Sequence, residues 1–157
     1  MTRHDVEQLQ TLAAGTARHR VRLCAHQDTA DALHEMLIVL DSATYVRPHR
    51  HPGKSESFHM IAGALRVVIF REDGEVADVI RMGDYASGRP FYYRLAEPAY
   101  HTVLPERERV VFHETTNGPF RREDTEFAPW APAEENAEAA RLYLHRLARD
   151  TTALTFP

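Results

Sequence analysis

Two histidines and a glutamate at short, regular spacing form the most chemically suggestive part of the sequence. His49 and His51 lie two residues apart, and Glu56 follows after a Pro52-Gly53 turn. Alternate residues of a strand point to the same face, so the two imidazoles should aim at one point. A strand that follows the turn would bring Glu56 back beside them. Two imidazoles and one carboxylate make a coordination set for a divalent first-row metal.

A fourth ligand must come from elsewhere in the chain. His101 is the best candidate, because it follows a turn at Pro98 and begins an inward–outward alternation with Val103. Three imidazoles and one carboxylate leave one or two open positions on a bound ion. Open positions allow the metal to polarise a bound oxygen or to activate water or dioxygen. The set suits Fe, Mn, Ni, Co or Zn, and the sequence does not choose among them.

Two residues of a strand predicted over 43–51 could contact a molecule bound at the metal. Tyr45 and Arg47 have the same parity as His49 and His51. Arg47 could clamp a carboxylate or phosphate through two parallel hydrogen bonds, or it could lie at the rim, paired with a surface acid or with the C-terminal segment. Tyr45 could offer its hydroxyl to the substrate or serve as a core aromatic.

Three further residues are candidates for the walls and chemistry of the site. Phe58 and Met60 share the face of Glu56 and are expected to form apolar walls of a cavity. His113 shares a face with Val111 in a late strand, so it is either an acid/base lining the pocket or a buried structural histidine.

The elements that must position these residues are short strands. From Arg20 to about Glu114 the chain consists of brief β-prone runs separated by turn residues such as Glu72-Asp73-Gly74. Such a pattern favours an all-β sandwich or barrel. Strands are predicted at 20–24, 34–40, 43–51, 56–61, 64–71, 75–81, 90–95, 100–104 and 109–116.

Helices are predicted at both ends of the chain. Residues 5–14 follow a helical period, with Asp5 as the N-cap and Gly15 as the stop. A second helix is predicted to begin with Pro132 at its first position. We therefore expect one domain in three parts. These are an N-terminal helical segment at 1–19, a β-barrel at 20–131, and a C-terminal helix and tail at 132–157.

The same residues carry a resemblance to a known family. His49-x-His51-x(4)-Glu56-x(6)-Gly63 matches the first cupin motif in every fixed position. Residues 43–51 (ATYVRPHRH), 117–120 (NGPF) and 127–134 (FAPWAPAE) resemble segments of the WbuC family of cupin-fold metalloproteins. The resemblance implies a cupin double-stranded β-helix (jelly-roll) barrel, with three metal ligands from the first motif and His101 as the fourth. The turn before His101 lacks the family's usual proline and glycine, which predicts a differently shaped turn.

Composition narrows the class of protein. The 157 residues are 43% hydrophobic and 27% charged, as in ordinary soluble globular proteins. The formal charge of −4 has the wrong sign for a nucleic-acid-binding protein. The longest apolar run, 36–40, is too short to span a membrane. A single cysteine and no visible leader favour a cytoplasmic location. We further expect a homodimer formed through residues 20–40.

These observations lead to a function expectation with open alternatives. The resemblance implies a sugar-related context, so we expect a metal-binding cupin that acts on or binds a sugar or sugar acid, with the metal polarising its oxygen atoms. One alternative is an Fe(II)-dependent oxygenase. Another is a protein that binds a small, possibly anionic ligand through its metal without catalysis. Whether the chain is an enzyme stays open, and His113 is the one candidate catalytic residue.

Overall fold

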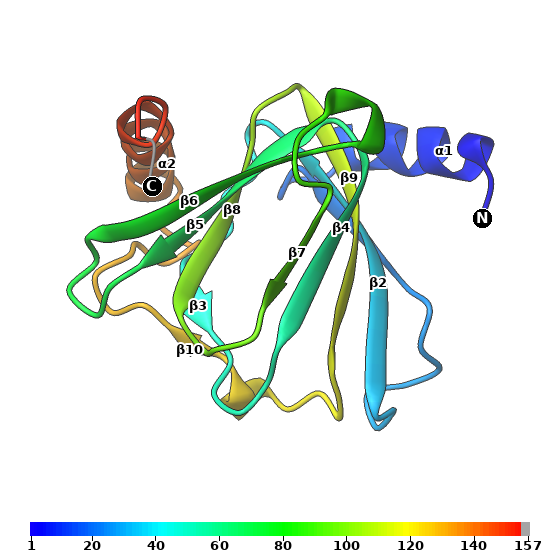
Figure 1. The fold of residues 1–157 in the computed structure, drawn as a ribbon, viewed down its shortest axis with the longest axis horizontal. Coiled ribbons are helices and arrows are strands. Elements are labelled where there is room, and N and C mark those ends of the chain that lie inside the picture. The colour runs from blue at the N-terminus through cyan, green and yellow to red at the C-terminus, as the bar shows by residue number, and fades with distance from the viewer. Residues whose placement is uncertain (155–157) are drawn as a thin grey trace.

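The computed structural model describes residues 1–154, in which ten strands form two antiparallel sheets of five (Figure 1). Sheet A has the order β1-β2-β9-β4-β7 and sheet B the order β10-β3-β8-β5-β6. The strands of sheet A are β1 (Arg20–Cys24), β2 (Leu33–Asp41), β9 (Arg109–Asn117), β4 (Glu56–Ala62) and β7 (Tyr92–Leu95). Those of sheet B are β10 (Glu126–Phe127), β3 (His49–Arg50), β8 (Tyr100–Pro105), β5 (Ala64–Phe70) and β6 (Val76–Gly83). Two short 3-10 helices lie at Tyr85–Ser87 and Arg122–Asp124. The all-β prediction is confirmed, as two sheets within the described residues.

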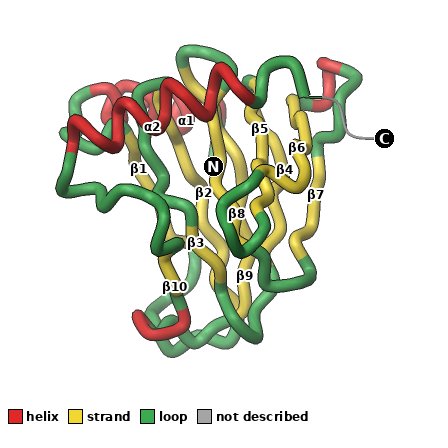
Figure 2. Tube along the Cα trace, turned by 90° about the vertical axis from the view of Figure 1, so that its left-hand side faces the viewer, coloured by secondary structure: helices red, strands yellow, loops and turns green. Residues whose placement is uncertain are grey.

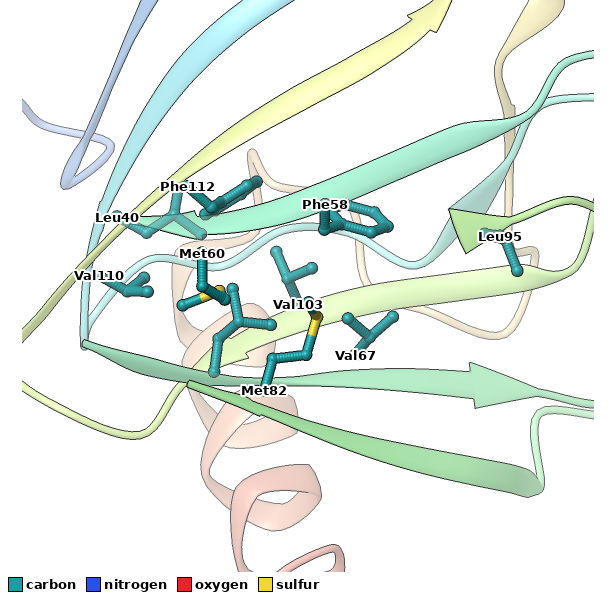
Figure 3. Packing of buried hydrophobic residues seen from close by; sticks show 10 residues of the cluster. Leu40, Phe58, Met60, Val67, Met82, Leu95, Val103, Val110 and Phe112 are labelled. Carbon is teal, nitrogen blue, oxygen red and sulfur yellow. The ribbon is translucent and has the colours of Figure 1, made fainter. Parts of the chain in front are cut away.

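Apolar side chains that point inward from both sheets fill much of the space between them (Figure 3). The cluster consists of Leu40, Phe58, Met60, Leu65, Val67, Met82, Leu95, Val103, Val110 and Phe112. Strand β4 links this core to a polar region, because Met60 and Phe58 belong to the core while Glu56 on the same face begins the strand. The polar end of β4 is where the candidate ligands lie.

Two helices cover the outer faces of the sheets (Figures 1 and 2). Helix α1 (Arg3–Ala14) packs Ala13 against Leu37, Val39 and Val111 on the outside of sheet A. Helix α2 (Ala137–Asp150) packs Tyr143, Leu144 and Leu147 against Val68 and Phe70 on the outside of sheet B. Each sheet is therefore apolar on both faces over part of its area. None of the helices in residues 1–154 has the length and apolar character needed to cross a membrane.

Both helices start at positions other than those predicted. Thr2, not Asp5, is the N-cap of α1, and Asp5 is its capping-box partner. Helix α2 begins after the N-cap Asn136 rather than at Pro132. The intervening residues are held elsewhere, because the Pro132 carbonyl accepts a hydrogen bond from Tyr45 and Glu134 pairs with arginines near β1.

The strand predicted over 43–51 is much shorter in the structure. Only His49–Arg50 pairs as β3, and residues 44–48 cross from sheet A to sheet B. Side chains satisfy part of this backbone, since the Thr102 hydroxyl donates to the Val46 carbonyl at 2.6 Å. Strand β10, which was not predicted, pairs with β3 and holds the crossing segment from the other side.

Candidate metal centre

Three of the predicted ligands come together in the structure. His49, His51 and Glu56 offer ligand atoms that all lie within 4.8 Å of one another. Arg50, the residue between the two histidines, points the other way and pairs with Glu72 and Glu126. The alternation of β3 thus aims both imidazoles inward, as the spacing predicted.

His101 reaches the same place from β8. It is the direct partner of His49 across the β3–β8 ladder, and the two ring centroids are 4.7 Å apart. Its Nε2 lies 2.9 Å from Glu56 Oε2, while His51 Nε2 lies 3.0 Å from Glu56 Oε1. Adjacent ligands around an ion with bonds of about 2.1 Å are roughly 3 Å apart, so these spacings suit coordination. His101 nevertheless lies outside the compact group of three.

The ring orientations fit a metal-binding role. The Nδ1 atoms of His49, His51 and His101 lie 2.8, 3.2 and 3.0 Å from the backbone carbonyls of Arg47, Asp124 and Ala99. A carbonyl only accepts, so each ring carries a proton on Nδ1, and Nε2 is the nitrogen that would offer its lone pair to a metal. The Nε2 atoms of His51 and His101 donate to the Glu56 carboxylate until a bound ion displaces those protons. Fixing the tautomer in this way is the usual preparation of a metal-ligating histidine. These residues therefore fit a divalent transition metal, whose identity the donor set leaves open.

Burial and mutual charge shift the pKa values of the cluster. Burial, followed by the neighbouring His101 and His51 charges, lowers the pKa of His49 to about 3, so this ring is neutral near pH 7. Burial acts to raise the pKa of Glu56, but hydrogen bonds from His101 and His51 hold it well below its usual value. The site thus presents a neutral imidazole and an ionised carboxylate, the protonation states that a metal requires.

The ligands open into a cavity of about 780 Å³ between the sheets. Arg47 lines this cavity beside them, with its guanidinium 4.9 Å from the Phe127 ring centre and one nitrogen donating to the Ala128 carbonyl at 3.1 Å. Its Nε is buried without a hydrogen-bond partner, and Arg47 forms no ion pair with any described residue. Arg47 thus lines the cavity without an ion pair and also contacts the C-terminal segment through Phe127 and Ala128, so both alternatives considered from the sequence are met in part.

The other predicted site residues divide between the cavity and the surrounding structure. Phe58 lines the cavity, whereas Met60 lies deeper in the core. Tyr45 packs near Tyr143 on the outer side of sheet B and donates its hydroxyl to Pro132, so it is placed as a core aromatic. His113 lies on the outer face of β9, with its Nε2 3.8 Å from Glu35, so the prediction that it lines the pocket was wrong.

Two cavity residues were not singled out from the sequence. Glu114 follows His113 and therefore points inward, where it stands opposite Phe58 on β4. Burial, then the charge of Glu56, raises its pKa to about 8, so Glu114 is mostly a neutral acid at pH 7. Arg22 lines the same cavity from β1. The alternation of Arg20, Arg22 and Cys24 in β1 was the available signal for it.

Comparison with known proteins supports the fold. Protein SO0799 from Shewanella oneidensis is similar, with a TM-score of 0.58, 14% identity, and coverage of 87% of this chain and 86% of that one. An uncharacterized conserved protein with a double-stranded β-helix domain from Klebsiella pneumoniae subsp. pneumoniae MGH 78578 has a TM-score of 0.53, 10% identity, and coverage of 69% and 79%. These likenesses show a double-stranded β-helix fold. A family model described as a domain of unknown function, DUF6016, matches residues 1–82. No curated protein matches the sequence.

Proposed function

We propose that this chain, which belongs to the DUF6016 family of domains of unknown function, binds one divalent transition metal and holds a small acidic molecule beside it. His49, His51 and Glu56 are the proposed core of the metal site, with His101 as the fourth ligand. The proposed ligand class is a carboxylate or phosphate, for which a sugar acid of the kind implied by the WbuC resemblance is an example. Cytoplasmic location and a homodimer remain part of this proposal.

One observation carries the proposal: an arginine without an ion-pair partner lines the same cavity as the converging ligands. A guanidinium matches a carboxylate or phosphate through two parallel hydrogen bonds. A volume of about 780 Å³ falls within the usual range for small-molecule sites. These observations support the proposal that Arg47 orients an acid whose oxygen atoms face the histidines.

When bound, the metal would supply polarisation of an oxygen atom of the held molecule. The chain's own residues supply binding and proton chemistry. Arg47 fixes the acid group, Phe58 and Phe112 give an apolar wall, and Glu114 holds a proton inside the cavity near pH 7. Proton transfer by Glu114 to a bound substrate would make the protein an enzyme of the isomerase or lyase kind. Oxygenase chemistry with iron, and binding without turnover, are the competing forms of the same proposal.

Metal analysis and calorimetry test the proposal in two steps. The untagged protein is purified without added metal, and its metal content is measured by mass spectrometry beside that of His49→Ala. Near-stoichiometric metal in the wild type, lost in the variant, supports the site. Bound iron would favour oxygenase chemistry, and zinc, manganese or nickel would favour polarisation of a substrate oxygen.

The second step is titration of the metal-loaded protein with small monocarboxylic acids. Arg47→Gln should weaken binding about tenfold or more while the metal content stays unchanged. A folded wild-type protein that takes up no metal, or an Arg47→Gln variant with unaltered affinity for every acid, would contradict the proposal.

A further inference from the structure

Four arginines line the cavity, and they differ in whether their charge is neutralised. Arg18 and Arg20 both pair with Glu134, whose Oε1 lies 3.2 Å from Arg20 Nη2. Arg20 also donates to the Tyr45 carbonyl at 3.2 Å, which fixes its guanidinium to the segment that leads to β3. These two arginines thus have a structural role in tying β1 to the C-terminal segment.

Arg22 is different. It faces the cavity from β1, the outermost strand of sheet A, where its cross-strand partner Ile38 is followed by Phe112 on β9. These neighbours are apolar, and Arg22 makes no hydrogen bond or ion pair with a described side chain. Glu114 lines the same cavity, but no ion pair between described residues joins it to Arg22, whose side chain is exposed at the edge of the sheet. The cavity therefore contains a second cation without an anionic partner.

Arg22 and Arg47 both line this cavity. Arg22 lies on the β1 edge of sheet A, whereas Arg47 lies in the segment that leads into β3 of sheet B. Apolar side chains of Ile38 and Phe112 line the cavity too. In a chain of formal charge −4, two guanidinium groups without ion pairs in one cavity favour an acidic ligand there.

We propose that the cavity takes a small molecule with two acidic groups, one held by Arg47 beside the ligand cluster and the other held by Arg22 at the β1 edge. This inference rests on the proposed function for its first acidic group and goes beyond it for the second. Two cations that line one cavity together with apolar side chains match a dicarboxylic acid, or a phosphorylated acid, with an apolar middle. Arg22 is a specificity-determining residue in this arrangement, because it selects diacids over monoacids.

Calorimetry with a homologous series of acids tests the second subsite. The zinc-loaded protein is titrated with straight-chain dicarboxylates from succinate to suberate, and with monocarboxylates of equal carbon number. We expect the best diacid to bind about ten- to a hundredfold more tightly than its matched monoacid, with a clear optimum of chain length. Arg22→Gln should reduce this ratio to about twofold, the statistical advantage of having two equivalent ends, because it weakens the binding of diacids far more than that of monoacids.

Matched variants distinguish a failure of the second subsite from a failure of the proposed function. Arg94→Gln, which removes an exposed arginine of β7 that is not among the cavity-lining residues, should preserve the diacid preference. Arg47→Gln should weaken monoacids and diacids alike. If monoacids bind in an Arg47-dependent way but diacids gain no more than twofold at any length, the second subsite is wrong and the proposed function stands. If Arg22→Gln leaves a large diacid preference intact, the inference about the second subsite is overturned. If no acid binds at all, both the inference and the proposed function are overturned.

Discussion

His49 and His101 occupy the same register position on the paired strands β3 and β8, with their rings 4.7 Å apart. The two residues are far apart in sequence, and their contact depends on a strand of only two residues, His49–Arg50. Because β10 pairs with the other edge of β3, this short strand is held from both sides. The ligand cluster is thus positioned by backbone pairing rather than by side-chain packing alone.

Replacing His49 should abolish stoichiometric metal binding. His49→Ala removes an imidazole that burial keeps neutral and whose Nδ1 is already fixed by the Arg47 carbonyl. His59→Ala is the matched control, because His59 points outward on β4 and is exposed. Mass spectrometry of purified protein should show metal lost in the first variant and retained in the second. Equal metal content in both variants would show that the ion lies elsewhere.

His101→Ala should weaken metal affinity by about a hundredfold or more. The altered turn before this residue suggested a misplaced ligand, yet the structure puts its Nε2 2.9 Å from Glu56. The variant also removes a hydrogen bond that keeps the Glu56 carboxylate ionised. Competition with a chromophoric chelator measures the change. An affinity within threefold of the wild type would mean that His101 only supports Glu56.

The candidate ligands were predictable because their geometry is local. His49 and His51 share a face wherever the chain is extended, and the Pro52-Gly53 turn returns it toward Glu56. His101 was proposed from the Pro98 turn and the alternation with Val103, and the resemblance agreed, but its partnership with His49 is a long-range pairing that no local pattern specifies. The alternation of side chains along a strand and the family motif were together enough to predict the four candidate ligands.

Which residues of β9 point into the cavity was not predictable in the same way. Val110 and Phe112 are buried inward, but Val111 is equally buried on the outer face, under α1. With both faces apolar, the hydrophobic pattern does not tell which parity points to the cavity. His113 was therefore assigned to the wrong face, and Glu114 was missed. Tyr45 is a core aromatic on the outer side of sheet B, the second of its two alternatives, because residues 44–48 are not a regular strand and strand parity does not apply to them.

Glu114→Gln should stabilise the metal-free protein at alkaline pH. The pKa of Glu114 is raised from 4.5 to about 8 in the folded state, so folding holds a proton that the unfolded chain releases. Stability should then fall as pH rises from about 4.5 to about 8, and this loss should be absent in the glutamine variant. We expect a difference of between about 1 and 5 kcal/mol at pH 9. Urea unfolding at several pH values measures it.

Urea unfolding of both proteins below pH 4.5 is the control for this prediction. Below pH 4.5 the Glu114 carboxyl is neutral in both states, so the variant and the wild type should have nearly equal stability there. A stability difference that stays constant from pH 4 to pH 9 would show that the substitution acts through packing rather than through the proton.

Gly63→Ala should destabilise the fold without emptying the metal site. Gly63 has φ +84° between β4 and β5, and a Cβ there would lie 2.7 Å from the Arg109 carbonyl oxygen. Gly53 has a similar φ of +75° with open space around it, so Gly53→Ala carries only the conformational cost, about 1–2 kcal/mol. The clash should add to that cost in Gly63→Ala, for a total of about 2–4 kcal/mol. Chemical denaturation of both variants measures the difference.

Equal stability of the two variants would contradict the close approach of Gly63 to Arg109. Metal content is the control. Because Gly63 lies beyond the end of β4 opposite to Glu56, folded Gly63→Ala should keep its metal.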